Sequence, residues 1–577
     1  MSSDCSIRVH DDILVSELTA ELGVHDVTAR CLLGRGVQKG PLAKAFLEPR
    51  LSGLRPPTGL AGLADALPRL VQAAQSGERV GVFGDYDVDG VTTATLLTEA
   101  LEAFGMKVVT QVASRKAGYG FTVEAAQKFV DEGCTLIITG DCGTSDIPSI
   151  ERAAEHSVPV IIIDHHTVPS ADAPHPSLAL INPFRADSEF PFQGMASVGL
   201  AFYVMGALRT ELRSLNHFGA SRPEPNVTTW LDLVAMGTVA DLVPLSHENR
   251  IMTTEGLRHL NRRARPGVDA LLEMAGVKRS ELVTERTIGW KLGPRLNAPG
   301  RLGDAQAALD VLRAPDRYTA QAAARLIETI NNERRTEQDK VFAEAMERLE
   351  TESPTEHSAI VVAGEGWAHG VVGIIASRLV DHFQKPAVVI AIDTESGEAR
   401  GSARSFGGVN LYNALDVSSE NLIRFGGHAA AAGLSMLPEH INSFREQFLA
   451  AVTEQGPETV IAYECDAEVG ADQVSEHLAN ELQTLAPFGK GNAEPLLMSR
   501  NVEVKASRRV GDGSHLKLTL KDEHGRELSG IAFGLGEKDP GAGNRIDVAY
   551  MPAITEWAGR KRLELSIKNL WPSADAS

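Results

Sequence analysis

The sequence contains no apolar run long enough to cross a membrane, and its first residues do not resemble a signal peptide. A bilayer span needs about 20 predominantly apolar residues. The opening stretch, MSSDCSIRVHDDILVSEL, carries acids where a leader peptide would have a basic and then an apolar segment. We therefore expect a cytoplasmic protein that does not associate with membranes.

Cysteine is scarce, and the cysteines that are present form no framework. They are five in number, scattered and without a CxxC pair: Cys5, Cys31, Cys134, Cys142 and Cys465. Disulfide-stabilised domains and thiolate zinc sites both need grouped cysteines. The sequence indicates neither of them.

A net positive charge, which would favour a nucleic-acid partner, is missing as well, since the formal net charge is −20. Binding needs only a local basic surface, however, so whole-chain charge is a weak guide. Residues 485–572 hold 14 Lys and Arg against 11 Asp and Glu and are more basic than the rest of the chain. Charge alone leaves a nucleic-acid partner open.

The chain is long enough for several domains, since 577 residues exceed what one hydrophobic core holds. Short apolar runs separated by helical patterns predict an α/β domain with a parallel sheet. We expect its strands at 80–83, 107–112, 135–139 and 158–163, and a helix at 92–104. Ligands of such sheets bind beyond the carboxyl ends of the strands.

Three further parts follow. A helix is predicted from 315 to 350, and its segment 331–340, polar on all sides, suggests a bridge through solvent between domains. A second α/β unit and then short alternating strands of a small antiparallel barrel come next. The predicted parts are a segment 1–75 packing on the first α/β domain, that domain at 76–314, the connecting helix 315–350, the second α/β domain 351–455 and the barrel 456–577.

The densest chemical signal is GDYDVDG (84–90), which places Asp85, Asp87 and Asp89 just after a buried strand. One Asp would suffice to cap a helix, so three carboxylates fit a metal better. An EF-hand loop would need Glu at its twelfth position, where this chain has Leu96. The sequence therefore predicts a metal site of another kind.

Further candidate ligands follow other predicted strands. Asp141 precedes Gly143, and Asp164, His165 and His166 end the fourth strand. Carboxylate and imidazole without thiolate suit Mn²⁺ or Mg²⁺.

The apolar segment LDLVAMGTVADLVPL (231–245) adds Asp232 and Asp241, between which spacing cannot choose. The set is too large for one ion and about sufficient for two, an arrangement that fits hydrolysis at phosphorus. Its members are Asp85, Asp87, Asp89, Asp141, His165, His166 and Asp241.

These motifs identify a family resemblance. GDYDVDG, GDCG, DHH and GTVADLVPL, in this order, resemble the four motifs of the DHH phosphoesterases. Over nearly the whole chain the resemblance extends to the RecJ branch of that family, through GPRLNAPGRLGDA (293–305), GWAHGVVGIIASRL (366–379), RSFGGVNL (404–411), FGGHAAAAG (425–433) and APFGKGNAEP (486–495).

The resemblance implies a DHH domain, a DHH-associated domain and an oligonucleotide-binding (OB) barrel. It further implies a two-metal exonuclease, with Mn²⁺ or Mg²⁺, that degrades single-stranded DNA from 5′ to 3′ into 5′-mononucleotides in DNA repair and recombination. Its implied metal ligands are Asp85, Asp87, Asp89, Asp141, His165 and Asp241. His166 would contact metal or the scissile phosphate, acting in catalysis with Asp87 and Asp141.

The resemblance also implies contacts with the DNA strand. Near the phosphate backbone it places Arg115, Arg295, Asn297 and Arg301, for which helix capping and surface ion pairs are the alternatives. For the strand and its end it implies His369, Arg404, Ser405 and His428, beside the close-approach glycines Gly426 and Gly427. The expected partners are single-stranded DNA, single-strand-binding protein and a RecQ-type helicase, and we expect a monomer.

Two departures from the family pattern bear on the alternatives. Phe83 stands where relatives with small substrates carry His, and Cys142 stands where relatives often have Asn. The first disfavours a DHH phosphodiesterase of oligoribonucleotides or cyclic dinucleotides, and the second suggests a changed hydrogen bond beside Asp141. A relative that has lost its metals and its activity is the other alternative, against which the complete set of carboxylates argues.

Overall fold

The structure is a computed structural model, and it describes residues 5–114, 120–169, 174–351, 357–457, 463–522, 524–557 and 560–573. The chain forms two compact units. One comprises Arg55–Val243 and Met252–Ile461, and the other comprises Met1–Leu54, Pro244–Ile251 and Ala462–Ser577. Within the described ranges, no helix has both the length and the apolar character that a membrane crossing requires.

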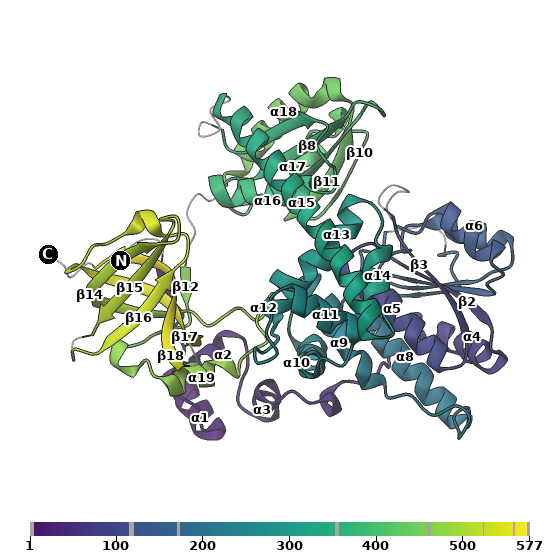
Figure 1. Cartoon of the computed structure of the whole chain (residues 1–577), viewed down its shortest axis with the longest axis horizontal. Helices are drawn as coiled ribbons and strands as arrows, with labels where there is room; N and C mark the ends of the chain where they lie inside the picture. Colours follow the sequence, from purple (N-terminus) through teal and green to yellow (C-terminus); the bar gives the residue numbers. More distant parts are fainter. Residues whose placement is uncertain are drawn as a thin grey trace. The chain divides into compact units, whose positions relative to one another are not determined.

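The first domain of the larger unit is built on a five-stranded, fully parallel sheet in the order β3-β2-β4-β5-β6. Figure 1 labels β2 and β3 of this sheet. Its strands are β2 (Arg79–Gly84), β3 (Lys107–Val112), β4 (Leu136–Gly140), β5 (Val160–Ile163) and β6 (Ala179–Ile181). The first four match the predicted strands to within about two residues, because continuous apolar runs buried on both faces leave little ambiguity. The three-residue β6 was not predicted.

Helices cover both faces of this sheet. Phe121, Phe129 and Ile150 of the α6–α7 side pack against Phe83 and Ile137 of the sheet in one buried cluster. The helices of the domain up to the connecting helix are α4 (Leu63–Ser76), α5 (Val88–Ala103), α6 (Val123–Asp131), α7 (Ile147–Glu155), α8 (Ser197–Ser214), α9 (Leu231–Ala240), α10 (His247–Arg262), α11 (Pro266–Met274), α12 (Glu285–Thr287), the π-helical η3 (Ile288–Leu292), α13 (Gly293–Leu302) and α14 (Gln306–Leu312).

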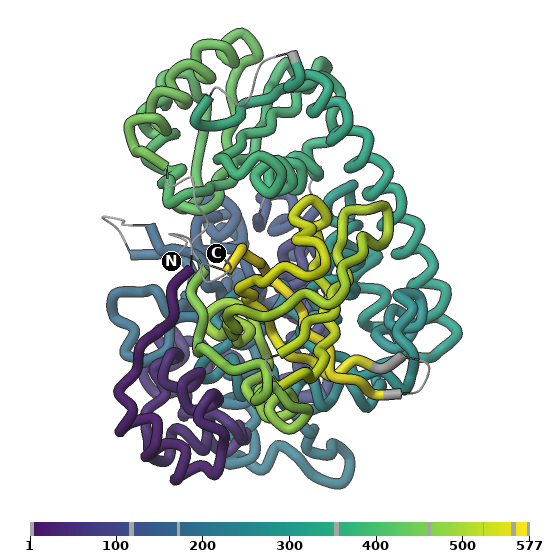
Figure 2. The backbone as a smooth tube through the Cα atoms, turned by 90° about the vertical axis from the view of Figure 1, so that its left-hand side faces the viewer, coloured from purple at the N-terminus to yellow at the C-terminus, as the bar shows by residue number. Residues whose placement is uncertain are grey.

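The predicted connecting helix is a single 35-residue helix, α15 (Arg317–Thr351), whose teal tube can be followed through the larger unit in Figure 2. Its inward face is apolar at both ends, for example at Ile327 and Val341. The middle is less solvated than its polar sequence suggests. Asn331 and Arg334 are buried there, and Arg334 Nη2 donates a hydrogen bond to Asn331 Oδ1 at 3.0 Å.

The second α/β domain has a mixed sheet in the order β10-β11-β9-β8-β7. Its elements are β7 (Ile360–Glu365), α16 (Val372–Phe383), β8 (Ala387–Asp393), β9 (Glu398–Arg404), α17 (Leu411–Val417), β10 (Arg424–Gly427), β11 (Ala431–Met436) and α18 (Ile441–Gln455). The β10–β11 hairpin lies at the edge of the sheet, where the glycine-rich segment 425–433 is largely exposed.

The smaller unit contains the predicted barrel. Its main strands are β14 (Leu497–Val510), β15 (His515–Lys521), β16 (Glu527–Ala532), β17 (Arg545–Trp557) and β18 (Arg560–Pro572). They pair in the order β14-β15-β16-β18-β17, and β17 pairs again with β14, which closes the barrel. Closure of this kind leaves no long free edge.

The sequence predicted that residues 1–75 pack on the first domain, but the structure divides this segment between the two units. Residues up to Leu54 group with the barrel, and the larger unit begins at Arg55. The reason lies in the apolar faces of α1 (Asp12–Leu22) and α2 (Asp26–Gly34), because Leu18 and Leu32 belong to the same core as Leu482 of α19 (Glu476–Gln483). In Figure 2 the purple strand β1 (Cys5–Ile7) leads into this unit, where it pairs in parallel with β12 (Tyr463–Cys465).

Arg35 holds this arrangement together. Its guanidinium donates to the carbonyls of Cys31 (2.6 Å) and Ala493 (2.6 Å) and to Asn492 Oδ1 (2.8 Å), and it lies 3.3 Å from Asp466 Oδ1. The side chain is 7% exposed. A buried charge with this many acceptors is costly to remove, because each acceptor then lacks a partner.

We expect Arg35→Ala to lower the free energy of unfolding of the barrel unit by about 3 kcal/mol. Urea denaturation of the full chain followed by tryptophan fluorescence measures this change. Arg30→Ala is the matched control, since Arg30 pairs with the exposed Asp12 at 2.7 Å and its removal should cost less than about 0.5 kcal/mol. Equal losses in the two variants would contradict the assigned role of Arg35.

Candidate metal centre

Three carboxylates lie in the turn between β2 and α5. Asp85 directly follows the strand and is buried, while Asp87 caps the helix by accepting the Gly90 backbone N–H at its Oδ1 (3.0 Å). Asp89 lies in the first turn of the helix and is 1% exposed. Glycine is required at position 90 because a Cβ there would lie 2.5 Å from the backbone nitrogen and oxygen of Asp85.

The N-terminus of α8 clamps Asp89. The backbone N–H of Ser197 donates to Asp89 Oδ2 (2.7 Å), and that of Val198 donates to Oδ1 (3.0 Å). The Ser197 hydroxyl also donates to Asp141 Oδ1 at 3.1 Å. Free N–H groups at a helix N-terminus favour negative charge. These two residues of α8 were not among the predicted site residues.

Asp141 and His165 join the carboxylates from the ends of β4 and β5. Asp141 has a φ of 64°, a left-handed conformation that Asp tolerates better than most residues. His165 Nε2 lies 3.3 Å from Asp141 Oδ1, 3.5 Å from Asp241 Oδ2 and 3.9 Å from Asp89 Oδ2. One imidazole nitrogen therefore faces three carboxylates.

Asp164 orients the second histidine. Its Oδ1 accepts the His166 backbone N–H at 3.1 Å and lies 2.7 Å from His166 Nδ1. Burial alone would lower the pKa of His166, but the hydrogen bond to Asp164 and its charge raise that pKa to about 9. Burial likewise opposes ionisation of Asp164, yet its hydrogen bonds with His166 and Thr144 hold the pKa of this carboxyl below its ordinary value.

A buried polar network supports Asp164 and His166 from behind. The Thr144 hydroxyl donates to Asp164 Oδ2 (2.6 Å), and Asn182 Nδ2 donates to the His166 carbonyl (2.8 Å). Sequence reasoning did not select either residue for the site. Asn182 directly follows β6, so the strand-end rule that found the other residues would have found it if that short strand had been recognised.

The side chains fit divalent metal ions. Three sets each place one ligand atom per residue within 4.8 Å of the others: Asp85, Asp87 and Asp141; Asp89, His165 and Asp241; and Asp141, His165 and His166. Their donors are carboxylate oxygens and imidazole nitrogens, which suit Mn²⁺ and Mg²⁺. Cys142 supplies no thiolate, because burial raises the pKa of its thiol and Sγ donates to the Gly140 carbonyl at 3.6 Å.

The electrostatics of the cluster also call for a cation. Burial and the nearby charge of Asp87 raise the pKa of Asp89 to about 7. Burial, followed by the charges of Asp89 and Asp87, raises the pKa of Asp141 well above its ordinary value. Buried like charges repel one another, and a divalent ion among them relieves this repulsion.

The structure distinguishes Asp232 from Asp241, between which sequence spacing could not choose. Asp232 forms a buried ion pair with Arg265, whose Nε lies 2.7 Å from Asp232 Oδ2 and whose Nη1 lies 2.5 Å from Glu99 Oε1. Asp241, at the C-terminal end of α9, faces His165 instead. Asp232 therefore has a structural partner, whereas Asp241 lies within the cluster of candidate metal ligands.

The residues expected near the phosphate backbone have different surroundings. Asn297 Oδ1 accepts the Val88 backbone N–H at 3.2 Å, directly beside the carboxylate turn. Arg301 Nη1 donates to the Gly370 carbonyl (3.2 Å). Arg295 is 7% exposed and forms a two-pronged ion pair with Glu328 at 2.6 and 3.1 Å. Arg115 lies outside the described residues.

In the second domain, three of the four expected strand contacts gather at one end of the sheet. Ala431 of β11 pairs with Arg404 of β9, and the Ser405 backbone N–H donates to the Ala430 carbonyl at 3.0 Å. His428 is exposed in the same hairpin, and burial lowers the pKa of Arg404. His369 is half-buried in the turn before α16.

Comparison with known proteins places these features in a family. Three family descriptions match: the DHH family N-terminal domain over residues 79–238, the DHHA1 domain over 356–454 and the RecJ OB domain over 465–569. The single-stranded-DNA-specific exonuclease RecJ of Bacillus subtilis (strain 168) is 35% identical over 569 residues, which cover 98% of this chain and 70% of that protein. Its counterpart in Salmonella typhimurium is 34% identical over 592 residues, which cover 99% and 100%.

The chain belongs to the RecJ family. A crystal structure of RecJ with Mn²⁺ from Thermus thermophilus matches with a TM-score of 0.83 and 28% identity, covering 100% of this chain and 81% of that one. A second structure of that protein, with Mg²⁺, matches with a TM-score of 0.77 and 26% identity over 100% of this chain and 80% of that one.

The predicted family, the α/β fold with its C-terminal barrel and the exonuclease enzyme class are confirmed by these matches. A RecJ-family site that binds divalent ions agrees with the clustered carboxylates and imidazoles described above.

Asp232→Asn and Asp241→Asn are expected to have opposite effects. The first breaks the buried pair with Arg265 and should lower the free energy of unfolding by about 3 kcal/mol, while the folded fraction keeps its activity. The second removes one of several mutually repelling carboxylates and should abolish activity without loss of stability. Thermal denaturation and a nuclease assay on the same preparations measure both, and an active Asp241→Asn variant would contradict the ligand assignment.

Metal should stabilise the protein more at high pH than at low pH. Because the pKa of Asp89 is raised to about 7, its ionisation destabilises the metal-free fold as the pH rises through that value. Metal binding requires the ionised form, so protons compete with it. Differential scanning fluorimetry should therefore show a larger Mn²⁺-induced rise in Tm at about pH 8 than at about pH 6. In Asp241→Asn the rise should shrink at both values, and equal rises in the unchanged protein would refute the proton competition.

Proposed function

We propose that the protein is an exonuclease that degrades single-stranded DNA from its 5′ end and releases 5′-mononucleotides. The observation that carries this proposal is the convergence of Asp85, Asp87, Asp141 and His165 at the ends of adjacent parallel strands, in a chain of the RecJ family. The relatives named above are single-stranded-DNA-specific exonucleases, which supports the choice of substrate.

We assign two divalent ions to the centre, held by the predicted ligands Asp85, Asp87, Asp89, Asp141, His165 and Asp241. The overlapping ligand sets, which share Asp141 and His165, support two neighbouring positions. When bound, such a pair of ions activates water and stabilises the charge that develops on phosphate oxygens. The turn at Gly90 and the α8 clamp on Asp89 keep the carboxylates in place, so little reorganisation is needed when substrate arrives.

His166 is assigned to the scissile phosphate. Its Nδ1 is engaged by Asp164, so Nε2 is the nitrogen left to contact substrate, and the side chain is 43% exposed. In the proposed hydrolysis, water adds to phosphorus and the bond from phosphorus to the 3′ oxygen breaks. A hydrogen bond from Nε2 to a phosphate oxygen or to the departing 3′ oxygen would stabilise that step.

The strand is proposed to contact residues of both α/β domains, and the barrel is proposed to bind single-stranded DNA. Asn297 lies beside the carboxylate turn, and the β9–β11 end of the second sheet presents Arg404, Ser405 and His428. The contacts proposed for Arg115, Arg301 and His369 rest on the family resemblance. OB barrels bind single strands by stacking and by contacts with the backbone.

The cellular setting forms part of the same proposal. On the family resemblance of the sequence motifs alone, we propose a role in DNA repair and recombination, with single-strand-binding protein and a RecQ-type helicase as partners. We further propose that the protein acts in the cytoplasm as a monomer.

The decisive experiment compares single strands labelled at the 5′ or the 3′ end, digested with Mn²⁺ or Mg²⁺. Label should be lost at once only from the 5′ end, and Asp87→Asn should reduce turnover at least about 100-fold while the protein remains folded. Immediate loss of the 3′ label would refute the polarity. Preference for dinucleotides over long strands would favour the small-substrate alternative, and absence of cleavage with either ion would refute the enzyme itself.

A further inference from the structure

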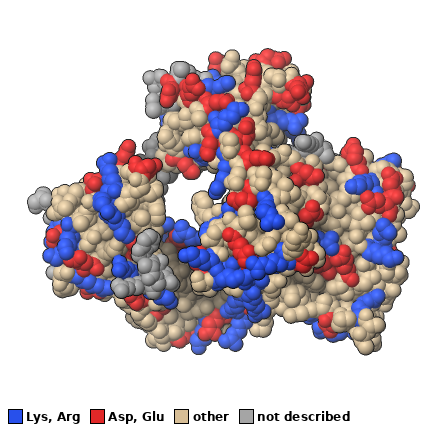
Figure 3. Space-filling model, viewed as in Figure 1, with Lys and Arg blue, Asp and Glu red and all other residues tan. Residues whose placement is uncertain are grey.

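A basic surface lies on the catalytic unit outside the metal centre. Figure 3 shows Lys and Arg side chains gathered over α10, α11 and α12. Residues 258–291 hold eight Lys and Arg against four Asp and Glu, although the whole chain has a net charge of −20. We define the α10–η3 surface as Arg262, Lys278, Arg286, Trp290 and Lys291, of which all but the half-buried Lys291 are exposed.

Hydrogen bonds join the segments that carry these residues. Asn261, at the end of α10, accepts the Val283 N–H at Oδ1 (2.9 Å) and donates from Nδ2 to the Val283 carbonyl (2.8 Å). Arg263 Nη2 donates to the Lys278 carbonyl at 2.6 Å. The end of α10, the turn at Lys278 and the segment that leads to α12 therefore form one continuous surface.

Trp290 is the unusual member of this surface. Its side chain is 76% exposed, in the π-helical segment η3, and π-helical turns often occur at functional sites. A Cβ placed on Gly289 would meet no atom within 4 Å, so the backbone next to Trp290 also borders open space. Arg286 precedes Trp290 by four residues, a spacing that puts both side chains on one side of the helix.

Three positively charged side chains of the α10–η3 surface are available to bind a ligand. Within the described part of the chain, Arg262, Lys278 and Lys291 form no ion pair with a carboxylate. Neighbouring arginines do, because Arg263 lies 3.4 Å from Asp269 and Arg265 pairs with Asp232. An open aromatic ring among such cations has the chemistry of a single-strand site, where bases stack and phosphates meet positive charge.

The position of Trp290 also fits a strand that leaves the metal centre. The η3 segment continues directly into α13, whose Asn297 accepts the Val88 N–H next to Asp87. The seven residues from Trp290 to Asn297 correspond to roughly 10 Å along a helix axis, a distance of a few nucleotides.

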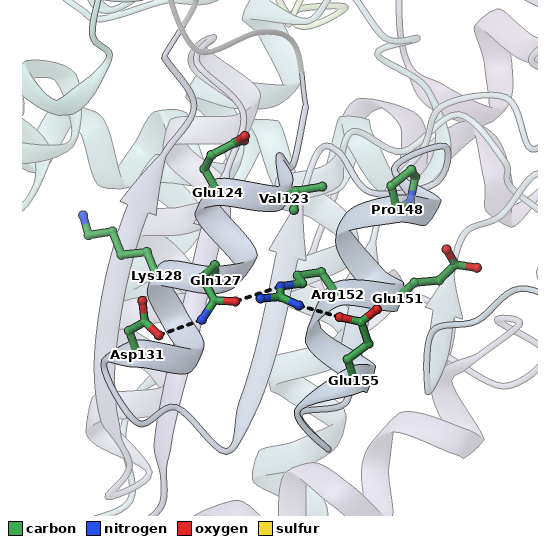
Figure 4. Close-up of a pocket in the computed structure, with 9 residues that line it drawn as sticks. All are labelled: Val123, Glu124, Gln127, Lys128, Asp131, Pro148, Glu151, Arg152 and Glu155. Atoms are coloured by element: carbon green, nitrogen blue, oxygen red, sulfur yellow. Dashed lines mark hydrogen bonds and ion pairs between the residues drawn. The ribbon is translucent and has the colours of Figure 1, made fainter.

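A second surface feature, the groove between α6 and α7, differs from the α10–η3 surface in its charge, in the pairing of its arginine and in having no aromatic ring. The open groove of about 680 Å³ between α6 and α7 is lined by four acids and two bases (Figure 4). Its Arg152 is engaged by Gln127 (2.8 Å) and Glu155 (2.6 Å), and no aromatic ring lines it. The charge of this groove does not suit a phosphate backbone.

We propose that the α10–η3 surface binds the single strand outside the metal centre, with a base stacked on the Trp290 indole and adjacent phosphates held by Arg286, Lys291, Lys278 and Arg262. This site rests on the proposed function, because it needs a strand whose end lies in the metal centre. It adds affinity for long strands.

The test measures binding of a strand of about 20 nucleotides to full-length protein that carries Asp87→Asn to prevent cleavage. Adding Trp290→Ala should weaken binding about five- to 100-fold, the range found for stacking aromatic residues. Trp290→Tyr should retain affinity within about threefold because it keeps an aromatic face, whereas Trp290→Leu should behave as Trp290→Ala. Lys278→Gln should reduce the slope of log affinity against log salt by about 1.

Leu282→Ala is the matched control, because Leu282 is 76% exposed on the same segment but has no aromatic face, and it should bind as tightly as its parent. Unchanged affinity in Trp290→Ala would overturn the site. Affinity retained in Trp290→Leu but lost in Trp290→Tyr would overturn stacking in favour of an apolar protein contact. Failure of the protein with intact Asp87 to cleave any single strand would instead overturn the proposed function, which distinguishes the two.

Discussion

Mutual repulsion among buried carboxylates is the constraint on which the catalytic unit depends. Asp89 and Asp141 are almost completely excluded from solvent and lie in reach of the same imidazole of His165. In a low-dielectric interior such charges strongly disfavour one another. The fold opposes this cost with backbone N–H groups of α8 directed at Asp89, and with a turn that only Gly90 permits. A bound divalent ion supplies what these donors cannot.

The topology of the parallel sheet explains why much of the site could be predicted from the sequence. Apolar strands buried on both faces are recognised from short apolar runs, and the topology of a parallel sheet brings their carboxyl ends together. Asp85 and Asp141 directly follow such strands, and His165 is the second residue after another. Their proximity therefore follows from chain order and sheet topology, without knowledge of any helix. The family resemblance then limited the possible chemistries.

Residues that act through long-range packing could not be found in this way. Asp232 and Asp241 lie nine residues apart in one apolar segment, and only the position of Arg265 shows which of them is neutralised by an ion pair. Ser197 reaches Asp89 and Asp141 because α8 packs across the sheet ends, for which no local pattern exists. The boundary at Leu54 likewise depends on which core receives the apolar faces of α1 and α2.

The distribution of charge shows why net charge predicted so little about the ligand. A share of the acids is concentrated at the metal centre, where bound cations would offset them, and these acids still count toward the formal −20. Some basic side chains are neutralised by ion pairs inside the fold. Arg265 pairs with Glu99, and Arg295 pairs with Glu328. A polyanion interacts with the basic side chains that stay exposed and unpaired, and only with those within a Debye length of about 8 Å. For a metal-dependent nuclease, the local charge of these exposed side chains determines strand binding. This local charge can be positive on one surface of a protein whose net charge is negative.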